Sequence, residues 1–513
     1  MADKVIVTNW SALEKKYGRG LPRIRRALAR LIAADQEERG ITTEVVGLDS
    51  RVEMGSARRR AVTQADDEAQ VKAAVDAVHA AHTPDYLMIL GAWDVVPMQQ
   101  LRNPVRDDED KTVPSDIPYA CAAPFDRDPA RFLGPTRVLG RLPDLVGRKD
   151  PAYLVSLLGT AARSSSRPRK EYQRYFGLSA EVWKVSTALS LIKVFGTAEE
   201  ILSSPPRGPS WRNAQLAPRA HFINCHGGAS DPKYYGQPAE RVRYPDAHRA
   251  SRLPGRVSNG TVIAAECCYG AELYDPKDSR GQPGICSTYL ADGAYGFFGS
   301  TTIAYGPSEG NGQADLICQF FLSAVLDGAS LGRAALEARQ RFAALHTHMD
   351  PTDLKTMVQF YLLGDPSVHA VAGASHAFSR SKTFQRVFHG AKATPGARAF
   401  RRERLARTGA NLQRTLGAVE PSRARAPSGV AKTLSQAANE SGIIRVLGRQ
   451  AYSVVFPPSA SAGVKRFAAA RRKRQVFALV GRKSTRGRVK RTVVLVATVE
   501  NGNIVHMRRV HSR

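Results

Sequence analysis

Hydrophobic residues in the first part of the chain alternate between short continuous runs and helical spacing. The apolar runs Val5–Val7 and Tyr86–Leu90 are typical of buried strands, whereas residues 24–32 repeat apolar positions at helical intervals. Strands that alternate with helices predict a parallel sheet covered by helices, so we expect an α/β subdomain over residues 1–147. Further strands are expected at Thr43–Leu48 and Arg137–Gly140, and further helices near 71–78 and 151–163.

The same alternation resumes after the polar stretch Ser164–Lys170. It predicts a second α/β subdomain over residues 148–372. Its expected strands end at Asn224, Ala265 and Gly299. The expected helices lie near 313–327, 331–345 (capped by Ser330) and 353–363 (stopped by Gly364-Asp365-Pro366).

The pattern changes near residue 372. Residues 373–440 are rich in Arg, Ala, Ser and Gly with weak periodicity, so we expect a basic linker with one helix at most. Strand signals return in residues 441–513 and predict a small basic β-rich domain, whose last two strands flank the hairpin pair Asn501-Gly502. The expected strands are Ile443–Leu447, Tyr452–Phe456, Val476–Val480, Thr492–Val499 and Asn503–Met507.

Net charge divides the chain at the same place. Of 513 residues, 75 are Lys or Arg and 46 are Asp or Glu, a balance of +29. Residues 371–513 hold 30 basic and 4 acidic residues (+26), which leaves 45 and 42 (+3) for residues 1–370. The excess positive charge of the C-terminal part creates an electrostatic field that attracts polyanions. Residues 373–513 are therefore a candidate binding surface for nucleic acid, an anionic membrane surface or an acidic protein.

Several classes of protein are disfavoured. No apolar run reaches the ~18 residues of a membrane span, and the first residues, Met-Ala-Asp-Lys-Val-Ile-Val, lack an apolar signal core. Six cysteines are too few for a disulfide scaffold. We therefore expect a cytoplasmic protein with reduced thiols, in which Cys121, Cys286 and Cys318 are buried and inert.

Two predicted strands end in residues that carry chemistry. One opens into His226-Gly227-Gly228, and another opens into Cys268-Tyr269-Gly270. Ligands bind at the carboxyl ends of strands in open α/β sheets. If the two strands are neighbours, a thiol and an imidazole share one edge, which is what nucleophilic cysteine catalysis requires.

These motifs resemble those of clan CD cysteine peptidases. Glu266-Cys267-Cys268-Tyr269-Gly270 resembles the Gln-Ala-Cys-x-Gly signature of caspases and the Glu-Ala-Cys of legumains. The segments 114–120, 138–143 and 362–367 resemble parts of the gingipain-type family. The resemblance covers roughly residues 1–372. It implies two caspase-like, Rossmann-like α/β subdomains side by side, with the active site on the second.

The resemblance also implies residue roles in a cysteine endopeptidase. Cys268 is the expected nucleophile, His226 the general acid/base, and the backbone N–H groups of Gly227 and Cys268 the oxyanion hole. A carboxylate at Glu266 in the substrate-binding pocket favours cleavage of a protein or peptide after Arg or Lys. Self-processing at Arg401, Arg402 and Arg404, or at Arg471–Arg474, is a further hypothesis. The mechanism uses no metal or other cofactor, so we expect none.

Other interpretations remain open at this point. The cysteine and histidine could be structural, or the fold could be an inactive pseudo-peptidase that serves as a scaffold for nucleic-acid binding. Cys225, His226, Cys267 and Cys268 could ligate zinc, although they lack a C-x₂₋₄-C pair. Glu266 could be a structural residue at a strand end, with its carboxylate hydrogen-bonded within the protein. The acidic cluster at residues 107–110 is expected in a solvated loop.

Overall fold

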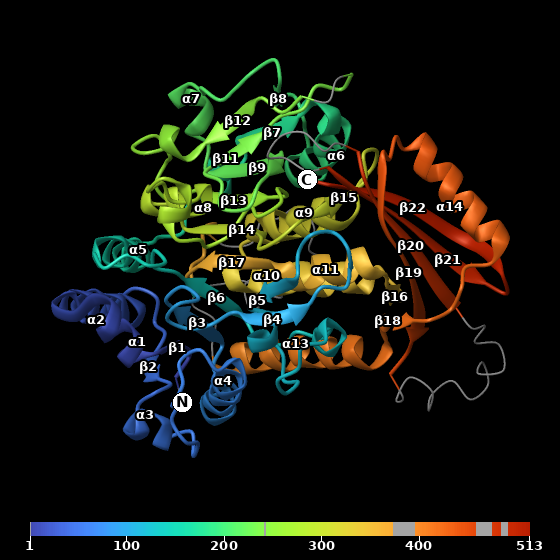
Figure 1. Ribbon diagram of the computed structural model, residues 1–513. Helices are drawn as coiled ribbons and strands as arrows, with labels where there is room; N and C mark the ends of the chain where they lie inside the picture. The colour runs from blue at the N-terminus through green and yellow to red at the C-terminus, as the bar shows by residue number, and fades with distance from the viewer. Residues whose placement is uncertain (1, 241–242, 373–394, 458–473, 484–490) are drawn as a thin grey trace.

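A ten-stranded, mostly parallel sheet runs through the α/β part of the computed structural model (Figure 1), which describes residues 2–240, 243–372, 395–457, 474–483 and 491–513. The strand order is β2-β1-β3-β6-β17-β14-β13-β9-β7-β8. In that order the strands are Thr43–Gly47, Lys4–Thr8, Tyr86–Leu90, Leu139–Leu142, Phe360–Gly364, Gly296–Ser300, Val262–Ala265, Ala220–Asn224, Tyr175–Ala180 and Ile201–Ser204. The α/β architecture predicted from the alternating pattern is thus confirmed.

The sheet consists of two parallel halves that run in opposite directions. Strands β2, β1, β3, β6 and β17 are parallel to one another, and so are β14, β13, β9, β7 and β8. The halves join where β14 pairs antiparallel with β17. The strands of the two halves therefore have their carboxyl ends on opposite sides of the continuous sheet, measured along the strand direction.

Helices cover both faces of the second half because its strands are apolar on both sides. Along β13, Ile263 and Ala265 belong to one buried cluster, and Val262 and Ala264 belong to another. On the first face α8 (Ile285–Ala291) packs against β14 and α5 (Ala152–Ala162), and α5 in turn packs against α2 (Leu21–Glu37), which contacts β2 in the first half. On the second, α9 (Gln313–Leu326) packs against both α6 (Lys184–Phe195) and α10 (Leu331–Ala344). None of the described helices is both apolar enough and long enough to cross a membrane.

The helix predicted over residues 353–363 is wrong in its second half. Helix α11 covers Pro351–Gln359, and the chain then enters the central strand β17. Every residue of β17 is buried. A short run that is apolar on every side fits a buried strand as well as the end of a buried helix, so its spacing does not distinguish them.

A second, seven-stranded sheet forms the C-terminal part and lies beside the α/β body (Figure 1). The predicted turn at Asn501-Gly502 is confirmed, since both residues have positive φ (51° and 83°) and Glu500 pairs with Asn503. In the order β15-β22-β21-β20-β19-β18-β16, the strands are Tyr305–Gly306, Asn503–Ser512, Thr492–Glu500, Arg474–Arg482, Arg445–Val455, Gly417–Ser422 and His348–Met349. Both edge strands, β15 and β16, come from the α/β body.

The segment expected to be a linker contains regular structure in its described part. Helix α13 (Pro395–Thr415), strand β18 and helix α14 (Ser428–Glu440) form within residues 395–440. Helix α14 buries Val430, Leu434 and Ala438, which are spaced four residues apart. Polar and basic residues separate these few apolar positions, which is why the periodicity is weak in the sequence.

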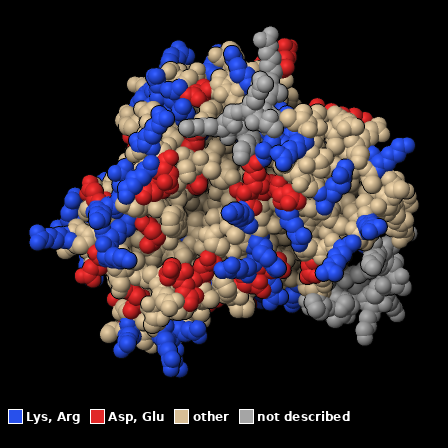
Figure 2. Space-filling view, viewed as in Figure 1, with Lys and Arg blue, Asp and Glu red and all other residues tan. Residues whose placement is uncertain are grey.

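Arginines of the C-terminal part form ion pairs with acidic residues of the body. Arg508 pairs with Asp350 and Asp353, and further pairs are Arg402–Asp85, Arg482–Glu109 and Arg513–Asp315. In Figure 2 both charges are interspersed over the body, whereas the side that carries the C-terminal sheet shows mostly basic side chains. Part of the excess positive charge is thus paired within the molecule.

We expect the substitution Lys4→Met to destabilise the protein strongly. The fully buried ammonium of Lys4, on β1, lies 3.0 Å from a carboxylate oxygen of Asp35 on α2 and 2.5 Å from one of Asp365, after β17. Removing one partner of a buried ion pair leaves uncompensated charge, which costs about 3–5 kcal/mol. Urea unfolding should show this loss, whereas the exposed Lys15→Met should change stability by less than about 0.5 kcal/mol. Equal loss in the two variants would contradict the prediction.

Candidate active site

Adjacent parallel strands bring together the segments that carry His226, in the short strand β10 (His226–Gly227), and Cys268. Strand β9 pairs with β13, with Ile223 opposite Ala265, and each segment begins at the carboxyl end of its strand. The backbones touch: a Cβ added to Gly227 would lie 1.8 Å from the carbonyl oxygen of Cys268. Only glycine allows this approach, so the glycine after His226 fixes the contact between the two segments.

Two backbone N–H groups converge on one carbonyl oxygen at this edge. The N–H groups of Cys268 and Gly227 donate to the carbonyl oxygen of Arg513, with N···O distances of 3.2 and 3.5 Å. These are the two groups for which the sequence predicts the oxyanion-hole role. Donors that meet at a carbonyl oxygen in this way would also stabilise the negative charge that develops on it during acyl transfer.

The side chain of Arg513 fills a buried acidic slot next to these donors. Its Nη2 lies 2.9 and 3.0 Å from the two carboxylate oxygens of Asp315, on the first turn of α9, and donates to the carbonyl oxygen of Pro307 at 2.9 Å. The guanidinium lies over the ring of Trp183, 4.5 Å from its centre. Arg513 and Asp315 are both fully buried. The slot therefore meets the charge of the guanidinium through Asp315 and its flat face through Trp183, whereas Nε and Nη1 make no described hydrogen bond.

Glu266 lies beside this slot but makes no described hydrogen bond to Arg513. The carboxyl group of Glu266 is fully buried and lies next to that of Asp315. Burial raises the pKa of Glu266 well above its usual 4.5, and the neighbouring Asp315 raises it further, against an opposing effect of Arg513. Glu266 is therefore neutral, and the ion pair with the guanidinium is the one that Asp315 makes. The sequence predicts Glu266 in this role and gives no sign of Asp315 or Trp183.

The imidazole of His226 is enclosed by aromatic rings. It packs against Trp183 and Tyr244, with ring centres 4.3 and 4.9 Å apart, and its Nε2 hydrogen-bonds Oε1 of Gln237 at 2.8 Å. Its Nδ1 has no hydrogen-bond partner. Burial lowers the pKa of His226 to about 3, and the charges of Arg491 and Arg513 act in the same direction. The ring is therefore neutral in this arrangement.

Of the two adjacent cysteines, Cys268 faces the C-terminal sheet. Cys268 belongs to the buried cluster that includes residues of β20, β21 and β22, whereas Cys267 lies in the core of the α/β body. The thiol of Cys268 donates to the carbonyl oxygen of Ala304 at 3.5 Å, and burial raises its pKa to about 12. Among the described contacts, no hydrogen bond joins Cys268 to His226. Thiol and imidazole are both neutral while Arg513 is in place.

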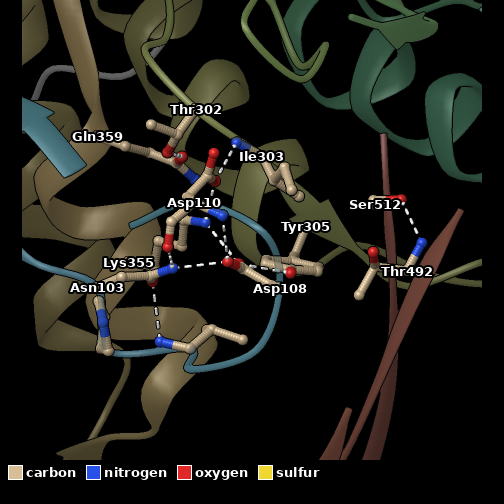
Figure 3. Close-up of polar contacts among 12 residues, drawn as sticks. Asn103, Asp108, Asp110, Thr302, Ile303, Tyr305, Lys355, Gln359, Thr492 and Ser512 are labelled. Carbon is tan, nitrogen blue, oxygen red and sulfur yellow. Dashed lines mark hydrogen bonds and ion pairs between the residues drawn. The ribbon is translucent and has the colours of Figure 1, made fainter. Parts of the chain in front are cut away.

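A buried cluster of charges holds the segment that borders the site (Figure 3). The ammonium of Lys355 lies 2.5 Å from Asp108 and 2.6 Å from Asp110. Asp108 also accepts a hydrogen bond from the hydroxyl of Tyr305 (2.8 Å), and Asp110 accepts one from the N–H of Ile303 (3.0 Å). The prediction of a solvated loop is thus wrong for these two aspartates. They are buried because Lys355 provides the opposite charge, and they fix β15.

Other sequence candidates lie apart from this chemistry. Cys121 and Cys286 are buried, and burial raises the pKa of each thiol to about 12. Within the described ranges, no three His, Cys, Asp or Glu side chains are placed to hold a metal ion.

A cleft of about 810 Å³ lies in the other half of the sheet, at the carboxyl ends of β1, β2 and β3. Asn9, Asp49 and Trp93 are among the residues that line it.

Comparisons with known proteins give a distant likeness to solved structures. No protein-family model and no curated protein matches the chain. Among solved structures, two crystal structures of the Saccharomyces cerevisiae separase–securin complex match 46% of this chain and 14% of that chain, with 12% identity and a TM-score of 0.27. The chain thus spans about a seventh of the length of the protein it matches.

Acid should loosen the C-terminal sheet from the body. Burial would raise the pKa of Asp350, but Arg508 of β22 and the hydrogen bonds from Asp353 and Thr352 lower it below its usual 3.8. Because the folded pKa is the lower one, the pair contributes its full stability above about pH 5 and loses it as pH falls through the depressed value.

Thermal unfolding between about pH 6 and pH 2.5 tests this linkage. The melting temperature of the wild-type protein should fall more steeply below about pH 4 than that of Asp350→Asn, so that the gap between the two narrows. Parallel curves over this range would contradict the linkage.

Proposed function

We propose that this chain is a cysteine endopeptidase of the caspase and gingipain type that cleaves after arginine, with Cys268 and His226 as its dyad. The observation that carries the proposal is the carbonyl oxygen of Arg513 at the N–H groups of Gly227 and Cys268, with the guanidinium of the same residue on Asp315. The two parallel halves of the sheet support an architecture of two caspase-like subdomains, with the chemistry on the second.

In the proposed reaction His226 takes the proton of the Cys268 thiol, and the sulfur attacks the carbonyl carbon of the scissile bond. The N–H groups of Gly227 and Cys268 stabilise the oxyanion. Collapse of the tetrahedral intermediate forms a thioester and expels the amine, which receives the proton from His226. Water, deprotonated by His226, then releases the carboxylic acid and regenerates the thiol. Water must enter the site first, since burial keeps both groups of the dyad neutral.

The geometry of the slot favours arginine over lysine. All described hydrogen bonds of the guanidinium come from Nη2, so the preference rests on stacking: the flat group lies over the indole ring of Trp183 while Nη2 donates to Asp315 and to the carbonyl oxygen of Pro307. An ammonium is a compact point charge that uses the carboxylate but not the stacking surface. The sequence prediction of Arg or Lys through Glu266 is thereby narrowed to Arg through Asp315.

Matched fluorogenic peptides with Arg, Lys, Asp or Asn before the scissile bond test this specificity. Because Arg513 fills the slot, the assay uses the chain of residues 1–513 and its Arg513→Ala variant. We expect the highest kcat/KM for Arg and no cleavage after Asp or Asn. Asp315→Asn should lower kcat/KM for Arg at least ~30-fold, as expected when one partner of a buried charge pair is removed.

Variants of the cysteines assign the nucleophile. Cys268→Ala should abolish turnover, and an arginyl acyloxymethyl ketone should label Cys268 alone, whereas the control Cys121→Ala should keep its activity. Turnover that survives Cys268→Ala, or a preference for Asp, would refute the proposal.

The competing proposal is a nucleic-acid-binding protein that uses residues 373–513 on an inactive scaffold. It rests on charge alone, and several of those arginines pair with the body. Self-processing would require local unfolding at two of the expected sites, since Arg401, Arg402 and Arg404 lie within α13 and Arg474 lies within β20. Residues 471–473 lie outside the described part of the chain.

A further inference from the structure

The end of β22 lies in the candidate active site as an added strand. Ser512 pairs antiparallel with Tyr305 of β15, and His511 pairs with Gly306. The N–H of Arg513 continues the ladder by donating to the carbonyl oxygen of Ala304 at 2.9 Å. Figure 1 shows the end of the chain at this position, between β15 and α6. Addition of an extended segment to a strand edge is a common way for proteins to bind peptides.

Three independent contacts give Arg513 the position of the residue before a scissile bond. Its N–H pairs with the edge strand, its carbonyl oxygen meets the two backbone donors, and its side chain fills the acidic slot. The fit is close: a Cβ added to Gly306 would lie 2.3 Å from the guanidinium. Gly306 therefore leaves the room that an arginine side chain needs on its way into the slot.

We propose that residues 510–513 are a tethered occupant of the substrate groove, which holds the site closed until the end of β22 leaves it. This inference rests on the proposed function, because it identifies the groove as the place where an arginine-containing peptide is cleaved. It adds a mode of regulation: the C-terminal sheet blocks the site and competes directly with peptides that present arginine.

Contacts upstream of Arg513 keep the segment in register. The hydroxyl of Ser512 accepts a hydrogen bond from the N–H of Thr492 at 3.0 Å (Figure 3), and both His511 and Ser512 are 2% exposed. Arg508, five residues earlier on the same strand, is bound to Asp350 and Asp353. A tether of this kind gives the occupant a high effective concentration, which a free peptide must overcome.

Burial of the dyad is a consequence of this occupancy. The segment excludes water from Cys268 and His226, and the charge of Arg513 is one of those that lower the pKa of His226. Departure of the segment would remove that charge and admit water, and both changes favour proton transfer between thiol and imidazole.

The decisive experiment measures peptide binding in a Cys268→Ala background, where catalysis is absent. The probe is a fluorescent eight-residue peptide that copies residues 506–513 and ends in an amide, and the readout is fluorescence anisotropy. We expect the peptide to bind the Arg513→Ala chain at least tenfold more tightly than the chain that keeps Arg513. Asp315→Asn should abolish this binding. A probe that ends in Ala should not bind, and Arg445→Ala, which alters an exposed arginine of the same sheet, should change nothing.

Equal binding to chains with and without Arg513, or binding to neither, would overturn the tethered occupant. Alkylation with iodoacetamide checks folding: a folded Arg513→Ala chain with its native Cys268 should react faster at Cys268 but not at Cys267. If that chain unfolds, Arg513→Lys keeps a cation in the slot and should bind the probe with intermediate affinity; affinity no higher than that of the Arg513 chain would contradict the proposal.

Activity separates this inference from the proposed function. With native Cys268, the Arg513→Ala chain should cleave the arginyl substrate at least tenfold faster than the wild-type chain. Binding of the probe without any cleavage would refute the peptidase while leaving the tethered occupant intact. Cleavage at equal rates by both chains would refute the tethered occupant and leave the peptidase intact.

Discussion

The ion pair between Arg513 and Asp315 is the interaction on which the closed arrangement depends. Both side chains are fully buried, and the fully buried Glu266 lies beside them. A charged carboxylate in such a place is very costly without a cation, so the slot strongly favours a guanidinium. Because Arg513 continues strand β22, filling the slot also fixes the register of the C-terminal sheet. A slip of one residue would place a serine against Asp315 and turn every side chain of the strand to the opposite face.

The two halves of the ten-stranded sheet contribute differently to the candidate site: the second half carries its residues, and the first half supports it. In the second half, parallel pairing of β9 with β13 places His226 and Cys268 in touching segments. The first half offers the equivalent edge, and its cleft of about 810 Å³ is lined without cysteine or histidine. Its contribution to the site is the loop that carries Asp108 and Asp110. Bound to Lys355, this loop fixes β15, the strand to which the end of the chain is added.

Local sequence patterns predict those elements whose structure depends on residues nearby in the chain. Strands β3 and β13 are uninterrupted apolar runs, and β1 has an apolar centre, Val5–Val7. The residues after β9 and β13 lie close together because adjacent parallel strands end on the same side of a sheet. Patterns fail where a distant partner decides the outcome. From the sequence, Asp108 and Asp110 are expected to be exposed to solvent. In the structure Lys355, about 245 residues later in the chain, pairs with both carboxylates and allows them to be buried. Asp315 is an ordinary acidic residue in a first helical turn, and its partner is 198 residues away.

The same reasoning gives the uneven charge of the chain a structural meaning. Arg508 lies on β22 and Arg513 directly follows it, yet the carboxylates that they contact, at the start of α11 and on α9, are buried in the nearly neutral body. Neither set would be stable in these positions alone, because an unpaired buried carboxylate changes its protonation or draws in water. Body and basic part therefore complete one another electrostatically. An α/β body without the C-terminal sheet would be a different molecule, with an open acidic slot and an exposed edge at β15, ready to receive another arginine-bearing strand.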